Sequence, residues 1–194
     1  MKRRILAILI AWVLIVSTGT AETFDTFDTF DSFDDFFMWE EPAFAQEMIA
    51  SASIPLRGTD ELINNVLHAA DSINDTVLPM YGIFSFNDIV GPRTEECGYL
   101  PALNGRGVTV VGGGVAQVAS VIWLAIRNLD EAVVLEKATY GSRYNQSYVD
   151  SSNDAILTDY NSGQDFAFRN YGEATLTIRT YVWNDELICE IYAE

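Results

Sequence analysis

Three consecutive glycines, Gly112, Gly113 and Gly114, run directly into an apolar segment that continues to Leu129. Glycine reaches positive φ and lets other atoms approach the main chain, but it costs conformational entropy on folding. Three together therefore indicate a turn with unusual geometry or contacts. The apolar residues that follow recur at spacings of three and four, which predicts a helix over residues 115–128. Because little of its circumference is polar, we expect the rest of a domain to enclose it.

The entrance of this predicted helix has two candidate uses. Free N–H groups and the positive end of the helix dipole can hold a phosphate or a carboxylate, and they favour the anionic form of a nucleophile in the first turn. Here Ala116 has no proton to lose and Gln117 offers only an amide, so the turn carries no nucleophile at these positions. The alternative is that the glycines only allow tight packing of a strand on the helix, and the sequence leaves both interpretations open.

Residues 1–21 have the pattern of an export signal. A basic head of Lys2, Arg3 and Arg4 precedes an apolar run over residues 5–16, and small residues follow up to Ala21. The run is short for a bilayer span, so we expect cleavage after Ala21, with an uncleaved anchor as the alternative. The predicted location is extracytoplasmic, either secreted or associated with the wall or membrane through this segment.

Residues 22–42 form a separate acidic linker. Units such as Thr23-Phe24-Asp25 repeat four times up to Asp34, and the segment contains no base. A period of three suits neither a strand nor a helix, and the acids repel one another, so we expect a disordered tether before a single domain at 43–194. A protein that interacts with partners through this acidic tail is one alternative function.

The charge of the chain restricts its partners. The formal net charge is -17, and removal of the three bases in the signal would change it to -20. Such acidity argues against nucleic acid as a partner and against an anionic membrane surface. Cationic surfaces, metal ions and wall polymers with free amines remain open as partners. Among these alternatives the expected partner is a cell-wall component or an envelope protein, with membrane contact only through the N-terminal segment if it is not cleaved.

The remaining pattern predicts an α+β fold, in which a mainly antiparallel sheet packs on the central helix. A second, N-terminal helix is expected from a cap at Thr59 or Asp60 to about Thr76. The expected strands are 48–55 at an edge, 80–86 with a turn at Asn87-Asp88, 132–137, 155–158, 166–169, and a hairpin of 175–182 and 186–192 around Trp183-Asn184-Asp185.

Several short motifs follow one another along this domain. They are Phe84-Ser85-Phe86-Asn87, Val90-Gly91-Pro92-Arg93-Thr94, Gly98-Tyr99, the glycine segment up to Ser120, Asp154-Ala155, and Asp165-Phe166-Ala167-Phe168-Arg169-Asn170. In order and approximate spacing they resemble VanW-like domains, which are named for an accessory gene product of vancomycin resistance clusters and occur in exported bacterial envelope proteins. The resemblance covers residues 48–192 and implies action at the cell wall, where the polymer is peptidoglycan.

The departures from this family pattern concern chemistry. The resemblance implies a cysteine where this chain has Ala116, and histidines in a segment that here contains Ala138 and Tyr140. A cysteine at a helix N-terminus that faces a histidine would form the thiolate needed for nucleophilic catalysis. Both are absent, so we expect a non-catalytic accessory or binding module with no catalytic residue and no cofactor. An enzyme that uses other groups, such as Asp154 or Ser120, is the second alternative function.

The expected ligand site is the glycine turn together with polar residues near it. Arg93 and Arg169 are candidates to clamp a carboxylate bidentately, and their alternative is to pair with some of the many acids. The complete predicted set is Gly112, Gly113, Gly114, Gln117, Ser120, Arg93, Asn87 and Arg169. Tyr140, Tyr144 and Tyr148 recur at every fourth residue and would either stack on sugar rings or pack an irregular loop.

Other residues with chemical potential are few. The single histidine, His68, is expected on the surface without a chemical role. Cys189 is expected to be buried, and an exported protein permits a disulfide with Cys97, which the sequence leaves open. The acids of residues 150–159 lack the regular spacing of a calcium loop, so no metal site is predicted.

Overall fold

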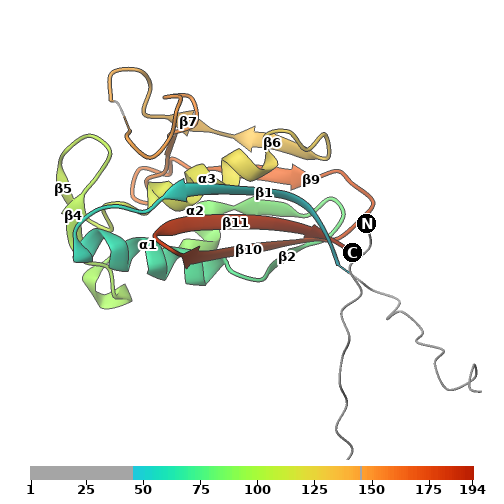
Figure 1. Ribbon diagram of the computed structural model, residues 1–194, viewed down its shortest axis with the longest axis horizontal. Coiled ribbons are helices and arrows are strands. Elements are labelled where there is room, and N and C mark those ends of the chain that lie inside the picture. Colours follow the sequence, from blue (N-terminus) through green and yellow to red (C-terminus); the bar gives the residue numbers. More distant parts are fainter. Residues whose placement is uncertain (1–45, 145) are drawn as a thin grey trace, which may run out of the picture. The chain divides into compact units, whose positions relative to one another are not determined.

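The computed structural model describes residues 46–144 and 146–194, which form an α+β unit as predicted (Figure 1). The expected export signal at 1–21 and the acidic linker at 22–42 lie outside the described residues. The largest sheet, sheet A, is antiparallel with the strand order β1-β11-β10-β2. Its strands are β1 (Glu47–Pro55), β11 (Glu186–Ala193), β10 (Leu176–Trp183) and β2 (Thr76–Leu78).

Sheet A confirms the predicted edge strand and hairpin. β1 pairs only with β11, and β10 turns into β11 through Asn184 and Asp185, whose φ values are 51° and 61°. Two residues at positive φ are typical of the hairpin turn that matches the twist of the strands. β2 was not predicted, because three residues are too few to show an alternating pattern.

Two helices cover the inner face of sheet A. α1 (Asp60–Ile73) packs on β10, and α3 (Ala116–Ile126) packs on β1 and β11. Both predicted helices are confirmed, although α1 ends three residues before Thr76, which instead starts β2. The Thr59 side chain caps α1 by accepting a hydrogen bond from the N–H of Leu62. The core between the helices and the sheet includes the fully buried Ile178, Leu187 and Ile191.

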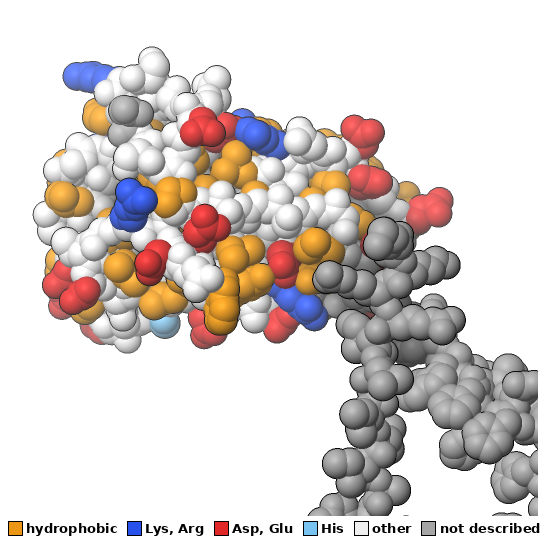
Figure 2. Space-filling model, in the orientation of Figure 1, with side chains coloured by type: hydrophobic (Ala, Val, Ile, Leu, Met, Phe, Trp, Pro, Cys, Tyr) orange, Lys and Arg blue, Asp and Glu red, His pale blue; other side chains and the backbone are white. Residues whose placement is uncertain are grey.

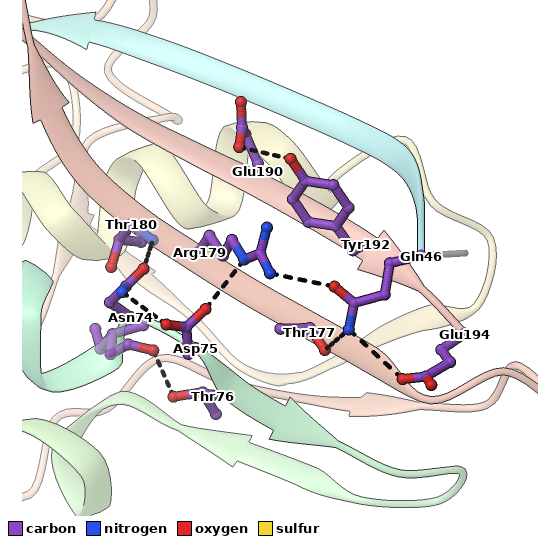
Figure 3. Close-up of polar contacts among 11 residues, drawn as sticks. Gln46, Asn74, Asp75, Thr76, Thr177, Arg179, Thr180, Glu190, Tyr192 and Glu194 are labelled. Carbon is purple, nitrogen blue, oxygen red and sulfur yellow. Dashed lines mark hydrogen bonds and ion pairs between the residues drawn. The ribbon is translucent and has the colours of Figure 1, made fainter. Parts of the chain in front are cut away.

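The outer face of sheet A carries a network of polar side chains (Figure 3). At its centre, the Nε of Arg179 donates to an Asp75 carboxylate oxygen at 3.0 Å, and Nη2 donates to the Gln46 side chain at 3.3 Å. The same guanidinium lies 4.6 Å from the ring centroid of Tyr192. The charge of Arg179 is therefore satisfied by other groups of the protein.

A second, three-stranded sheet, sheet B, has the order β3-β9-β6, from β3 (Ile83–Ser85), β9 (Ala167–Asn170) and β6 (Ala132–Glu136). The strand expected at 80–86 is shorter than predicted, and the turn expected at Asn87-Asp88 is wrong. Both residues lie in a short helix, α2 (Phe86–Val90), because Ser85 accepts a hydrogen bond from the N–H of Asp88 and caps a helix start.

Two further strand pairs form separate two-stranded sheets, and a 3-10 turn, η2 (Glu95–Cys97), precedes them in the chain. β4 (Pro101–Leu103) and β5 (Thr109–Val111) form a hairpin at one end of the described unit, and β7 (Ala138–Thr139) pairs with β8 (Ile156–Leu157). Of these only β8 was predicted, as the strand at 155–158. The hairpin and the loops around β7 and β8 shape the candidate site.

The surface shows no single charged patch on the face seen in Figure 2, where acidic and basic side chains are scattered among apolar ones. Cys97 is exposed and Cys189 is buried in sheet A, and both are free, so the disulfide left open by the sequence is not formed. His68 is exposed, as expected, with its ring edge-on to Tyr99. Among the described residues, no helix has the length and apolar character needed to cross a membrane.

Candidate functional site

The glycine turn is shaped by close packing on three sides. Gly112 and Gly114 have φ values of 79° and 98°, which residues with a side chain rarely adopt. A Cβ at Gly112 would lie 2.6 Å from the Arg93 side chain, and one at Gly114 would lie 2.6 Å from Leu62. A Cβ at Gly113 would overlap the carbonyl of Ala102 in β4. Tight packing thus accounts for all three glycines, and it leaves the backbone of Gly112 and Gly114 beside a cavity.

α3 begins immediately after this turn without a side-chain cap. The N–H groups of Gln117 and Val118 donate to the carbonyls of Gly114 and Val115, at 2.9 Å and 3.0 Å. In the part of the chain that the structure describes, the N–H groups of Gly114 and Ala116 donate no hydrogen bond to the protein. The entrance of α3 therefore keeps two donors available, at the positive end of the helix dipole.

A cavity of about 470 Å³ opens in front of these donors. Ala116 and Tyr140 both line it, so the two positions at which the resemblance implies a cysteine and histidines do lie in one site. Ala138, in β7, is not a lining residue and pairs instead with Leu157 of β8. The polar side chains of the cavity are Arg93, Asn104, Arg106, Tyr140, Thr158, Asp159, Tyr160, Asn161, Ser162 and Gln164.

Arg93 is held firmly in this cavity. Its Nη1 donates to Oδ1 of Asn87 at 2.8 Å, and its guanidinium lies 5.5 Å and 5.7 Å from the ring centroids of Phe86 and Tyr160. Its Nη2 is buried and has no hydrogen-bond partner among residues 46–144 and 146–194. Burial lowers the pKa of Arg93, although nearby Tyr99 and Asp165 oppose the shift. Arginine stays protonated even so, which leaves a buried cationic donor without an acceptor.

A second arginine, Arg106, comes from the turn of the β4–β5 hairpin. The ring of Tyr140 packs so closely under Gly105 that a Cβ there would lie 2.6 Å from it, and Gln146 Nε2 donates to the Gly105 carbonyl at 2.6 Å. Arg106 was not among the site residues predicted from the sequence. The signal was present, because Asn104-Gly105 followed by Val108 is the type of sequence that turns a hairpin.

Asn87 and Gln117, both in the predicted set, lie close to the site but not on its wall. Asn87 is buried and joins Arg93 to the carbonyl of Gln164, to which its Nδ2 donates at 3.0 Å. Gln117 is 5 % exposed, and its Oε1 is buried without a partner. Asn87 therefore positions Arg93, while Gln117 points into the protein.

Ser120, Asp154 and Arg169 do not line the cavity. The Ser120 hydroxyl donates to the Ala116 carbonyl and accepts from the N–H of Ile156, each at 2.9 Å, which fastens β8 to α3. The carboxylate of Asp154 accepts from Trp123 Nε1 and from Arg127. Arg169 lies in β9 of sheet B. The structure thus does not bring Arg93 and Arg169 together as a clamp.

The three tyrosines differ in role. Burial raises the pKa of Tyr140 and of Tyr148. Tyr140 is the one of the three that lines the cavity. Over the described ranges, 46–144 and 146–194, no group of three or more His, Cys, Asp or Glu side chains has the geometry to hold a metal ion.

Comparison with known proteins gives two matches. A family model described as "VanW like protein" matches residues 61–192, which include every residue of the cavity. The chain is also 30% identical over 133 residues to the uncharacterized protein YoaR of Bacillus subtilis, a match that covers 67% of this chain and 42% of YoaR. The match thus spans less than half of that relative's length. No solved structure matches the chain.

Proposed function

Because the chain belongs to the VanW-like family, we propose that it is an exported accessory module that binds a cell-wall component in the cavity without making or breaking bonds. The observation that carries the proposal is the pairing of Ala116 and Tyr140 in one cavity. A methyl group and a phenol stand where a thiol and an imidazole would be required, so the site keeps its shape and donors but lacks a nucleophile with its base.

The other side chains of the cavity do not replace that pair. The hydroxyls of Thr158 and Ser162 line it, but the lining contains no histidine or lysine, and its one carboxylate, Asp159, already accepts from the N–H groups of Asn161 and Ser162. Because burial raises the pKa of Tyr140, its phenol is protonated near neutral pH and cannot act there as a base. What remains is a set of hydrogen-bond donors and acceptors around a concave site, which suits recognition.

The cell-wall setting has separate support. The family is named for vancomycin resistance, and residues 1–21 have the pattern of an export signal. The acidic chain also disfavours nucleic acid as a ligand. A mature protein outside the cytoplasmic membrane would meet peptidoglycan directly.

The test is calorimetric titration of the full chain with soluble peptidoglycan fragments. We expect saturable binding that is lost in Ala116→Trp, because the larger side chain would occupy the cavity. A matched variant, Ser147→Trp, places the same indole on an exposed residue outside the cavity and should bind normally. Equal binding by both variants would show that the cavity is not the site.

A second experiment separates this proposal from action through the acidic tail. Deletion of residues 22–42 should leave fragment binding unchanged if the cavity is responsible. Loss of binding in the deletion variant, with a folded domain by circular dichroism, would instead assign the function to the tail.

A further inference from the structure

We propose that the cavity is a carboxylate site, in which Arg93 and the entrance of α3 hold the ligand's carboxylate while Arg106 of the β4–β5 hairpin completes the clamp. This inference rests on the proposed function, since it names the chemistry that the cavity recognises. It replaces the pairing of Arg93 with Arg169, which lies in sheet B.

The first argument is the unsatisfied Nη2 of Arg93. A buried charged donor without an acceptor is costly and is rare in folded proteins. The chain contains many carboxylates that could pair with Arg93, since it has 28 acidic and 11 basic residues. Nevertheless, neither ion pair found among the described residues includes Arg93. Arg93 is therefore a cation in the site without an ion pair, although acidic residues are abundant in the chain.

The two acids whose charges act on Arg93, Asp159 and Asp165, accept hydrogen bonds from other groups. The Asp165 carboxylate accepts hydrogen bonds from Ser85 Oγ at 2.6 Å, from Asn87 N at 2.9 Å and from Phe166 N at 2.7 Å. Asp159 Oδ1 accepts from the N–H of Asn161 at 3.0 Å and from that of Ser162 at 3.4 Å. Both carboxylates thus stabilise local turns, and neither forms an ion pair with Arg93.

Arg93 is also preorganised for this task. The Asn87 contact occupies Nη1, and the rings of Phe86 and Tyr160 flank the guanidinium, so the orientation of Nη2 is fixed before a ligand arrives. Gly114 and Ala116, whose N–H groups donate to no described residue, line the same cavity at the positive end of α3. Rigid donors bind without the entropy cost of ordering them.

Arg106 supplies the second cation, from the β4–β5 hairpin that borders the cavity. The described residues give it no ion pair, and its side chain is exposed at the hairpin turn. The hairpin turn is held because Tyr140 packs under Gly105 and the Nε2 of Gln146 donates to the Gly105 carbonyl. Tyr140 is thus a positioning residue, which acts on the ligand by placing Arg106.

The charge of the cavity favours a carboxylate over a phosphate. A planar carboxylate matches the fork of a guanidinium, and it carries one negative charge. Asp159 lines the same cavity and would repel a second negative charge on the ligand. In wall material a carboxylate occurs at the end of a peptide or on an acidic sugar, and the two sources are separated by the probes below.

The experiment is a titration of the full chain, at fixed ionic strength, with acetyl-Ala-Ala carrying a free carboxylate, the same dipeptide as its C-terminal amide, glucuronic acid, and inorganic phosphate. Binding is followed by the amide NMR signals of Gly112, Gly114 and Ala116. We expect a carboxylate probe to bind at least tenfold more tightly than the amide and more tightly than phosphate. The stronger of the dipeptide acid and glucuronic acid identifies the source of the carboxylate.

The matched variants are Arg106→Gln and Arg57→Gln, both at exposed arginines, of which only Arg106 lines the cavity. We expect Arg106→Gln to weaken carboxylate binding about three- to tenfold and Arg57→Gln to leave it unchanged. Tyr140→Ala should weaken binding to a similar degree, and the double variant Tyr140→Ala/Arg106→Gln should be no weaker than either single one. A purely additive double variant would remove the positioning role from Tyr140.

The proposal would be overturned if the amide bound as tightly as the acid, if phosphate bound more tightly than either carboxylate, or if Arg106→Gln bound like Arg57→Gln. Failure of the proposed function has a different signature. In that case the carboxylate probes bind and respond to Arg106→Gln, but peptidoglycan fragments do not bind. Conversely, fragments that bind a protein indifferent to the carboxylate would support the function and reject this inference.

Discussion

Two regions of this protein each contain an arginine with defined contacts, and they differ in whether the guanidinium finds partners within the protein. On the outer face of sheet A, Arg179 pairs with Asp75, contacts Gln46 and lies over the ring of Tyr192 (Figure 3). At the entrance of α3, Arg93 lies between rings and one amide, and a buried nitrogen is left without a partner. The sheet face satisfies its charge within the protein, whereas the cavity keeps one available.

The two arginines also differ in what their environment does to the charged form. The hydrogen bond from Arg179 to Asp75 raises the pKa of Arg179, while burial lowers the pKa of Arg93. An unpaired buried donor typically costs roughly 1–3 kcal/mol. Natural proteins tolerate such a cost mainly at functional sites, which is why the cavity and not the sheet is the candidate site.

The largest effect is expected where the glycine turn meets the hairpin. Gly113→Val should lower the free energy of unfolding by about 3 kcal/mol or more, because its side chain would overlap the Ala102 carbonyl in β4. Gly107→Ala is the matched control, since φ is 77° but no atom lies within 4 Å of the added Cβ, and it should cost only about 1–2 kcal/mol. Urea denaturation measures both. Similar losses would mean that the turn is not tightly packed.

Ser120→Ala should lower the free energy of unfolding by about 1–3 kcal/mol, because the buried N–H of Ile156 would lose its acceptor. Ligand binding should be unaffected, since Ser120 does not line the cavity. Ser147→Ala, at an exposed residue, provides the baseline. Thermal unfolding and fragment titration of the two variants distinguish the outcomes. Unchanged stability with lost activity on a wall substrate would restore Ser120 as a catalytic candidate.

Ala116→Cys would report the electric field of the cavity directly. Arg93, Arg106 and the end of α3 favour the thiolate, so the pKa of the new thiol should fall below the value of about 8.5 for free cysteine. The rate of alkylation by iodoacetamide, measured against pH in a Cys97→Ser background, should therefore rise at lower pH than for a free thiol. Adding Arg106→Gln should move the profile back toward higher pH.

Cys189 serves as the internal reference in that experiment. Burial raises the pKa of Cys189, which is fully enclosed in sheet A, so it should not react in the folded protein. If the thiol introduced by Ala116→Cys titrates at or above the free value, the cavity is not electropositive, and the comparison with sheet A fails.

The smallest effect is expected on the outer face of sheet A. Arg179→Gln should reduce stability only slightly, and less at high salt, because exposed ion pairs contribute little and are screened. Fragment binding should stay the same. The measurement is urea denaturation at low and high salt. A large loss of stability in Arg179→Gln would contradict the expectation that the ion pair on this face contributes little to the free energy of unfolding.

The parts of the fold that could be predicted are those with long periodic patterns. α1, α3 and the β10–β11 hairpin follow from apolar spacing, a Thr59 cap and a short polar turn. α2 was misread as a turn because its five residues are too short for a period, although Ser85 and Asp88 provide a cap signal. Local sequence therefore predicted the layers but not the short connections.

The candidate site was predicted only in part, for a physical reason. The position of Ala116 after the glycines, and the place of Arg93 nearby, could be inferred from motifs. Arg106 reaches the cavity only because the hairpin folds back and Tyr140 packs under Gly105, which are contacts between distant parts of the chain. Arg169 was a false partner for the same reason, because strand pairing places it in sheet B.

The central claim is that the cavity at the entrance of α3 recognises a wall component and does not transform it. The most direct measurement incubates the full chain with peptidoglycan fragments and follows the fragments by mass spectrometry and the protein by the amide NMR signals of Gly112, Gly114 and Ala116. We expect these signals to shift saturably while every fragment keeps its mass. A change in fragment mass that Ala116→Trp abolishes would contradict it.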